Sequence, residues 1–268
     1  MNTLNSAFAP ETSVSKTDLT TEEVDFFRSN GWVGKYSLLT PSGVEVATSI
    51  HNKALTDFTA WDKISTATKE ELDARPWFKS MHTTIPEYRA IANHPFIVDK
   101  IASILGEDII IWGVSTTHRK PNQKHRWHVD IEHKHWKGVS VFVGLKGTSF
   151  LSSLSLITTS HTIDTIPQQL NINDDATALE FCKNINPEAE LVTVDINEGD
   201  FFLFDGLTWH GSDNKGDCDR IGIIIQYSTP AYEIKIPCNY DEPIVWHSAK
   251  PQAVLAKGTD TYKLNNLK

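Results

Sequence analysis

The chain changes character at Asp108, and this change constrains the fold more than any other feature of the sequence. From Asp108 to Pro230 there are short runs rich in β-branched and aromatic residues, separated by turn residues: DIIIWGVSTTH, VSVFVGLKG, FLSSLSLITTSH, ELVTVDI, DFFLFDG and RIGIIIQYSTP. One helical insert, DDATALEFCKN, interrupts them. Many short strands at this spacing predict a β-sandwich or barrel over about 107–230.

The residues before this point predict helices. Thr20 and Glu23 have the spacing of a capping box, and Gly31 stands where that helix would end. Further helices are predicted over 42–61 and over 86–105, where Pro95 divides the second stretch into two.

The whole chain is expected to form one domain over 19–268. A helical layer over about 19–106 would pack on the β core, and a C-terminal segment, 231–268, would follow it. Residues 1–18 are polar and aperiodic, so they predict a flexible tail, or a strap that orders on the folded body.

Composition excludes several classes of function. The formal net charge is −9 and no dense Lys/Arg block occurs, so we expect no nucleic-acid partner. No run of 18 apolar residues and no signal-peptide pattern is present, so we expect no membrane association. The three cysteines have no CxxC spacing, which favours a reducing, cytoplasmic location.

The sharpest local motif is Trp127-His128-Val129-Asp130. On a strand, side chains two positions apart point to the same face, so His128 and Asp130 could bind one metal ion inside the barrel. The motif alone is weak evidence for a metal site, because a hydrogen-bonded histidine beside a surface aspartate has the same sequence.

A second motif lies further along the chain. His210 follows the apolar strand FFLF and a turn, and Arg220 opens another apolar strand ten positions later. A charge at the start of a buried strand needs a partner. An anionic ligand would satisfy it, and so would Asp217 or Asp219 at the turn.

The combination of the two motifs is more informative than either one. Two histidines and one carboxylate leave three adjacent positions open on iron. 2-Oxoglutarate could chelate through its keto oxygen and one carboxylate, with dioxygen in the last position. Its far carboxylate would then need a cation, and the guanidinium of Arg220 gives a bidentate, charge-assisted bond.

These segments resemble the phytanoyl-CoA dioxygenase-like branch of the iron(II)/2-oxoglutarate oxygenases. The similarity runs from TTEEVDFFRSNGWV through RKPNQKHRWHVD and the TTSH segment to DGLTWHGSDN and Arg220, over roughly 18–230. The resemblance implies a double-stranded β-helix (jelly-roll, cupin-like) core with flanking N-terminal helices. It also implies His128, Asp130 and His210 as iron ligands and Arg220 as the 2-oxoglutarate anchor.

The sequence departs from the family in one segment. GTSFLSSLSLITTSH lacks the Asn-Gly and Pro-Gly pairs usual before the Ser-His, which removes the basis for an inference about the substrate side. Halogenating relatives replace the carboxylate with a small residue. Asp130 is intact here, so halogenation is disfavoured.

Other residues are candidates for binding roles. Lys120 precedes Pro121, as in a Lys-Pro pair that the family often has near the co-substrate, and Ser212 could hydrogen-bond the co-substrate. Trp136 and His135 could contact substrate. Trp127 and Trp209 are expected to point away from the metal and pack. The loop 131–137 and the C-terminal segment are both candidate lids.

We therefore expect an iron(II)- and 2-oxoglutarate-dependent dioxygenase. It would use O2 to hydroxylate an unactivated C–H bond of a small metabolite, for instance in natural-product biosynthesis, and would release succinate and CO2. Desaturation and cyclisation are open alternatives for the reaction. A non-enzymatic jelly-roll protein that binds a metal or ligand is the alternative function. The substrate and the oligomeric state are not predicted.

Overall fold

The computed structural model describes residues 7–13, 17–59, 81–132, 136–170, 172–235 and 252–268. Within these residues the helices are η1 Pro10–Ser13, α1 Thr21–Asn30, α2 Pro41–Thr59, α4 Met81–Thr84, α5 Pro86–Ala92, α6 Pro95–Leu105, η3 Ser160–Thr162, η4 Pro167–Gln169 and α7 Asp175–Ile185. The strands are β1 Trp32–Ser37, β2 Ile109–Arg119, β3 Lys124–His128, β4 Gly138–Gly144, β5 Leu154–Ile157, β6 Leu191–Thr193, β7 Asp200–Asp205, β8 His210–Asp213, β9 Arg220–Ser228, β10 Gln252–Lys257 and β11 Asn266–Leu267.

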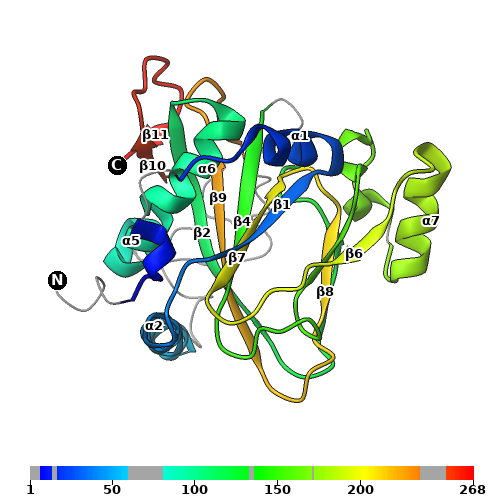
Figure 1. Ribbon diagram of the computed structural model, residues 1–268, viewed down its shortest axis with the longest axis horizontal. Coiled ribbons are helices and arrows are strands. Elements are labelled where there is room, and N and C mark those ends of the chain that lie inside the picture. The colour runs from blue at the N-terminus through cyan, green and yellow to red at the C-terminus, as the bar shows by residue number, and fades with distance from the viewer. Residues whose placement is uncertain (1–6, 14–16, 60–80, 133–135, 171, 236–251) are drawn as a thin grey trace, which may run out of the picture.

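The strands form two sheets that face each other, which is the arrangement of the predicted jelly-roll core (Figure 1). The large sheet has the order β1-β7-β4-β9-β2-β10-β11, and the small sheet has the order β3-β8-β5-β6. Strands β3 and β8 are neighbours in the small sheet although some 80 residues separate them in the chain, and their pairing brings His128 opposite His210.

Helices cover the outer face of the large sheet. On β9, Ile221, Ile223, Ile225 and Tyr227 belong to one apolar cluster with residues of α5 and α6. Their spacing of two along the strand puts all four side chains on the same face of the sheet. Both faces of β9 are buried, which explains why its sequence is apolar almost throughout.

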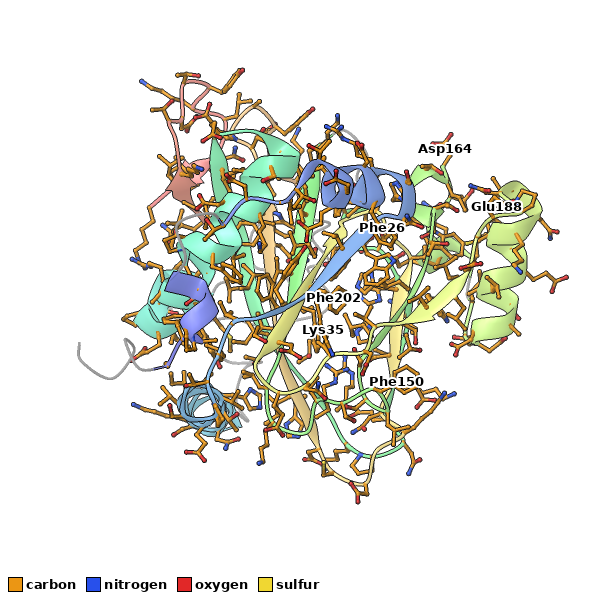
Figure 2. All side chains as sticks on the ribbon, in the orientation of Figure 1. Phe26, Lys35, Phe150, Asp164, Glu188 and Phe202 are labelled. Carbon is orange, nitrogen blue, oxygen red and sulfur yellow. The ribbon has the colours of Figure 1, made fainter. Side chains whose placement is uncertain are left out.

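The space between the two sheets holds a second apolar cluster. Phe142 and Phe202 from the large sheet pack there with Leu154 and Leu156 from the small sheet. Figure 2 labels Phe202, which is fully buried, and Phe26, which is 44% exposed on α1. This cluster fills part of the barrel and supports the neighbouring strands that carry the motifs.

The helix predictions are confirmed. Thr20 and Glu23 form both bonds of the capping box, and Gly31 ends α1 in the left-handed conformation with φ 79°. The stretch 86–105 is divided at Pro95 into α5 and α6. The helix predicted over 42–61 corresponds to α2, and residues 60 and 61 lie outside the described residues.

Part of the N-terminal segment that is described lies against the folded body. Ala7 is 2% exposed, and Phe8 forms a β-bridge with Leu39. The backbone N–H of Ala9 donates to the carbonyl of Leu38. Residues 7–9 therefore pack on the folded body.

The C-terminal segment contributes to the sheet. Strand β10 pairs antiparallel with β2, and β11 pairs with β10, so these residues extend the large sheet. The lid prediction for this segment concerns Trp246 and His247, which lie outside the described residues. None of the described helices is both long enough and apolar enough to cross a bilayer.

Candidate metal centre

Two histidines from paired strands face each other between the sheets. His128 ends β3 and His210 begins β8, and their ring centroids are 4.0 Å apart. The Nδ1 of each ring is 2.9 Å from a backbone carbonyl, that of Arg126 for His128 and that of Thr208 for His210. A carbonyl accepts only, so each Nδ1 carries the proton, and each Nε2 is the ring nitrogen that can bind a metal.

Asp130 joins the histidines from a turn and not from a strand. Strand β3 ends at His128, so the expectation that both residues of the motif lie on one strand was wrong. Instead, the backbone N–H groups of Asp130 and Ile131 both donate to the carbonyl of Gly206, at 2.9 Å each. Ser140 of β4 also donates to Asp130 Oδ2. These bonds fix the carboxylate, and its Oδ1 lies 3.9 Å from His210 Nε2.

One donor atom from each of the three residues lies within 4.8 Å of the other two. Burial is the main cause that lowers the pKa of His128 well below its usual value, and the neighbouring His210 and His125 lower it further. A neutral imidazole is the form that binds a metal. Two histidines and a carboxylate on one side of a site form the facial donor set that suits non-haem iron(II).

Arg220 opens β9 close to these residues and is almost completely buried, at 1% exposed. Its Nη1 donates to Thr117 Oγ1 at 2.7 Å and its Nη2 to Ser212 Oγ at 3.0 Å. Burial, followed by the charge of Arg119, lowers the pKa of Arg220 to about 9, so the guanidinium remains protonated at neutral pH.

The alternative in which an aspartate pairs with Arg220 does not occur. Asp219 Oδ2 is 2.7 Å from His118 Nε2, and no salt bridge joins Arg220 to Asp217 or Asp219 among the residues described. The Nε of Arg220 is buried and has no protein acceptor. Arg220 is therefore a buried cation whose partners are neutral hydroxyl groups, which is an arrangement suited to an anionic ligand.

The three candidate metal ligands and Arg220 line one pocket of about 340 Å³. Its wall comprises the three candidate ligands and Arg220, together with Thr117, Arg119, His125, Leu154, Gly211, Ser212 and Ile224. The charged groups of the wall are two guanidiniums and a single carboxylate, that of Asp130. An organic anion that also chelates a metal fits such a wall.

The other predicted residues lie elsewhere or outside the described residues. Lys120 is exposed and is not part of the pocket wall, where Arg119 stands instead. Trp136 is 2% exposed and packs edge-on against Trp112 in a separate apolar cluster, so it does not line this pocket. His135 and two of its neighbours lie outside the described residues.

The two tryptophans that precede the ligand histidines pack as predicted. Trp127 and Trp209 belong to one buried cluster beside α7. Trp209 stacks on Phe181 of that helix, with ring centroids 5.3 Å apart. Thr208 donates to the carbonyl of Gly31, which links the turn before β8 to the end of α1.

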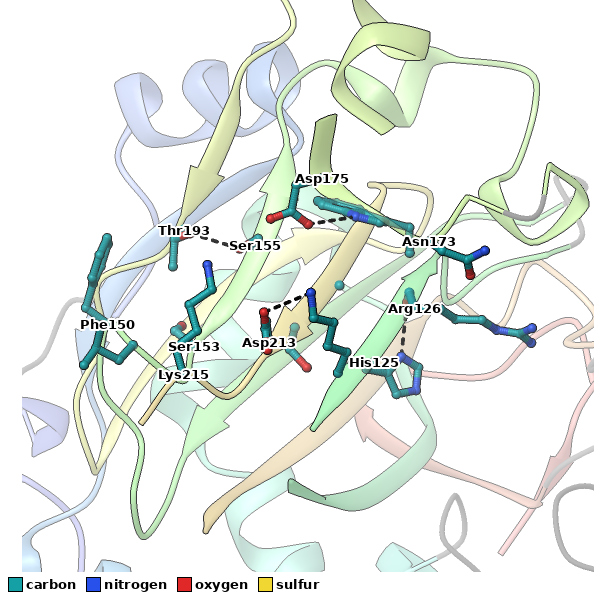
Figure 3. Close-up of a pocket in the computed structure, with 15 residues that line it drawn as sticks. His125, Arg126, Phe150, Ser153, Ser155, Asn173, Asp175, Thr193, Asp213 and Lys215 are labelled. Carbon is teal, nitrogen blue, oxygen red and sulfur yellow. Dashed lines mark hydrogen bonds and ion pairs between the residues drawn. The ribbon is translucent and has the colours of Figure 1, made fainter. Parts of the chain in front are cut away.

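A broader hollow lies on the opposite face of the small sheet (Figure 3). Four of its polar side chains pair with one another: Lys124 with Asp213 at 3.3 Å, and Ser155 with Thr193 at 2.9 Å. The Nε1 of Trp127 also donates to Asp175 there. This hollow contains neither the three candidate metal ligands nor Arg220.

Sequence reasoning missed several polar residues on the inner face of the large sheet. Thr117, Ser140 and Gln226 come from strands that appear uniformly buried, so the sequence does not mark them. Counting in twos from Arg220 along β9 would have found Ile224 and Gln226 on the inner face. Gln226 is 1% exposed, and neither its Oε1 nor its Nε2 has a protein partner.

Several solved structures share this fold. CytC3, solved with Fe(II) and α-ketoglutarate, aligns over 95% of this chain and 94% of its own, with TM-score 0.66 and 17% identity. The non-haem monooxygenase ThoJ, solved as a nickel complex, aligns over 89% and 84%, with TM-score 0.63 and 22% identity. EctD from S. alaskensis aligns over 80% and 78%, with TM-score 0.58 and 17% identity.

At these identities the similarity concerns the fold. Comparison with curated protein sequences gave no match. The model of the phytanoyl-CoA dioxygenase family, however, matches residues 27–222. This range is more than half of the chain and includes the candidate metal ligands and Arg220, so the chain belongs to the phytanoyl-CoA dioxygenase family.

Proposed function

We propose that this protein is an iron(II)- and 2-oxoglutarate-dependent dioxygenase that hydroxylates an unactivated C–H bond of a small metabolite. The observation that carries the proposal is one pocket in which a facial 2-His-1-carboxylate set faces a buried arginine without an anionic partner. The family match supports the same cofactors. CytC3, which shares the fold, was solved with both iron(II) and α-ketoglutarate.

In this proposal His128, Asp130 and His210 hold the iron. The protonated Nδ1 atoms orient both rings, and Ser140 orients the carboxylate, so the donor set is arranged before metal binds. The hydroxyls of Thr117 and Ser212 accept from Arg220 and can still donate their own protons. Arg220, Thr117 and Ser212 would therefore bind the far carboxylate of 2-oxoglutarate.

The bound iron and 2-oxoglutarate supply the oxidising power: 2-oxoglutarate, O2 and a C–H group become succinate, CO2 and a C–OH group. The protein positions the reactants and excludes water. The aromatic ring of Phe204 lies 4.7 Å from that of His210, and Ile224 and Leu154 form an apolar part of the pocket wall, so one side of the donor set is apolar.

The first test is anaerobic titration of the purified protein with iron(II) and 2-oxoglutarate. Chelation of both should produce a weak visible charge-transfer band, whereas a non-enzymatic metal-binding protein would stay colourless. Asp130→Ala should lose the band, and Asp213→Ala is the matched control. Asp213 lies in the small sheet, as the two ligand histidines do, but it pairs with Lys124 on the other face of that sheet. Loss of the band in both variants, or in neither, would refute the assignment.

The second test addresses the reaction. With oxygen present, succinate release should rise when a candidate metabolite is a substrate, and the product should gain one oxygen atom. Removing a metal ligand should lower succinate release by more than about a hundredfold, because even groups that only orient ligands are worth about 10- to 100-fold. A product that has lost two hydrogen atoms would show that the reaction is desaturation or cyclisation and not hydroxylation.

A further inference from the structure

Arg119 stands beside Arg220 at one end of the metal pocket. The two residues are paired across β2 and β9, and both belong to the pocket wall. Thr117, two positions before Arg119 on β2, faces the same side and accepts a hydrogen bond from Arg220. Two guanidinium groups and one hydroxyl therefore come from adjacent strands of the large sheet.

Arg119 is poorly satisfied by the protein. Its Nη1 donates to the carbonyl of its neighbour His118 at 2.8 Å, and its Nε is buried without an acceptor. No salt bridge to Arg119 occurs among the residues that the structure describes. Asp219, which precedes Arg220 in the chain, lies 2.7 Å from His118 instead.

Two cations that line one small pocket repel each other unless an anion lies between them. A carboxylate has two oxygens with about four acceptor positions, and charge-assisted bonds to it are the strong ones. Arg220 already uses two of its nitrogens on hydroxyl groups. The remaining N–H groups of Arg119 could therefore donate further hydrogen bonds to a carboxylate placed beside Arg220.

We propose that Arg119 is a second anchor for the co-substrate and binds, together with Arg220, the distal carboxylate of 2-oxoglutarate. This inference rests on the proposed function. It assigns to Arg119 the role that sequence resemblance suggested for Lys120, whose side chain is exposed and outside the pocket wall. The two residues are adjacent in the chain, so they can be compared directly.

The test measures the affinity for 2-oxoglutarate from the charge-transfer band of the anaerobic iron(II) protein, and the affinity for iron(II) separately. Arg119→Gln should weaken 2-oxoglutarate binding by about tenfold or more, since a charge-assisted hydrogen bond is lost. Lys120→Gln removes the same formal charge one residue away and should change the affinity less than twofold. Iron(II) affinity should be unchanged in both variants.

Arg119→Lys keeps the charge and loses the planar fork, so its affinity should fall between those of the wild type and Arg119→Gln. The proposal is overturned if Arg119→Lys binds 2-oxoglutarate as the wild type does, or if Lys120→Gln is weakened as much as Arg119→Gln. It is also overturned if iron(II) affinity falls in parallel. A wild-type protein with no band would instead refute the proposed function itself, so the two failures are distinguishable.

Discussion

The two faces of the large sheet are built from the same strands but differ in composition. On β9 the outer face carries Ile221, Ile223, Ile225 and Tyr227, all packed against helices. The inner face carries Arg220, Gly222, Ile224 and Gln226, of which Arg220 and Ile224 line the metal pocket. Successive side chains of β9 point to opposite faces of the sheet. Its outward-facing residues therefore stabilise the fold, and its inward-facing residues contribute to the site.

The largest effect expected from this division is on stability. Ile225 is completely buried on the outer face, so Ile225→Ala should lower the free energy of unfolding by about 2–5 kcal/mol through lost burial and a cavity. Chemical denaturation measures this change. The affinity for iron(II) should stay at its wild-type value, and a parallel loss of metal binding would show that the two faces are not independent.

Acid should destabilise the helical cover of the outer face. His82 of α4 is fully buried, and its Nε2 is 3.0 Å from the carbonyl of Gln252 in β10. Burial lowers the pKa of His82 to about 4, whereas an unfolded histidine has a pKa of about 6.5. The unfolded state therefore binds the proton first, and stability present above pH 6.5 is lost as the pH falls towards 4.

This acid effect should reach about 3 kcal/mol for His82, because each pKa unit of difference is worth about 1.4 kcal/mol. Measuring the free energy of unfolding at pH 7.5 and pH 4.5 shows it. His82→Gln should flatten the pH dependence. His51, whose pKa burial also lowers to about 4, should leave a residual slope. An unaltered pH profile in His82→Gln would contradict the prediction.

The inner face should affect metal binding through Ser140. This residue lies on β4 of the large sheet and donates to Asp130. Ser140→Ala should weaken iron(II) binding by about 10- to 100-fold, the usual effect of removing a group that orients a ligand. Ser155→Ala is the matched control, since Ser155 pairs with Thr193 on the far face of the small sheet. Equal affinities in the two variants would contradict the role of Ser140.

The smallest predicted effect has the opposite sign and concerns the neighbour of Ile225. Gln226 is buried on the inner face without a protein partner for either polar atom of its side chain. Gln226→Leu should therefore raise the free energy of unfolding by about 1–3 kcal/mol, because it removes an unsatisfied buried group while keeping the volume. A destabilised Gln226→Leu protein would show that the amide is satisfied in solution.

The sequence predicts where helices and strands lie better than it predicts which of their side chains face the pocket. The capping box at Thr20, the break at Pro95 and the apolar strands are local signals, and the structure has them where they were expected. The order of the HxD motif, His210 and Arg220 also predicts residues that the fold brings into one pocket. These features depend on neighbouring residues or on a fixed order along the chain.

What the sequence could not provide depends on pairing between distant strands. Asp130 is held by Gly206 and Ser140, so its orientation does not follow from a two-residue spacing on one strand. The choice between Arg119 and Lys120 depends on which of them faces inward from β2, and a one-residue shift reverses the answer. Trp136 packs on Trp112 of β2, a contact between distant residues that no local pattern in the sequence indicates.

The pairing of β10 with β2 has a consequence for how the protein can be shortened. Without Gln252–Lys257, the backbone N–H and C=O groups that β2 directs towards β10 at Ile109–Ile111 would lose their pairing partners. An unpaired strand edge of this kind can form backbone hydrogen bonds with a strand of another chain. A version of the protein that stops before residue 252 should therefore self-associate, even though every pocket residue would still be present.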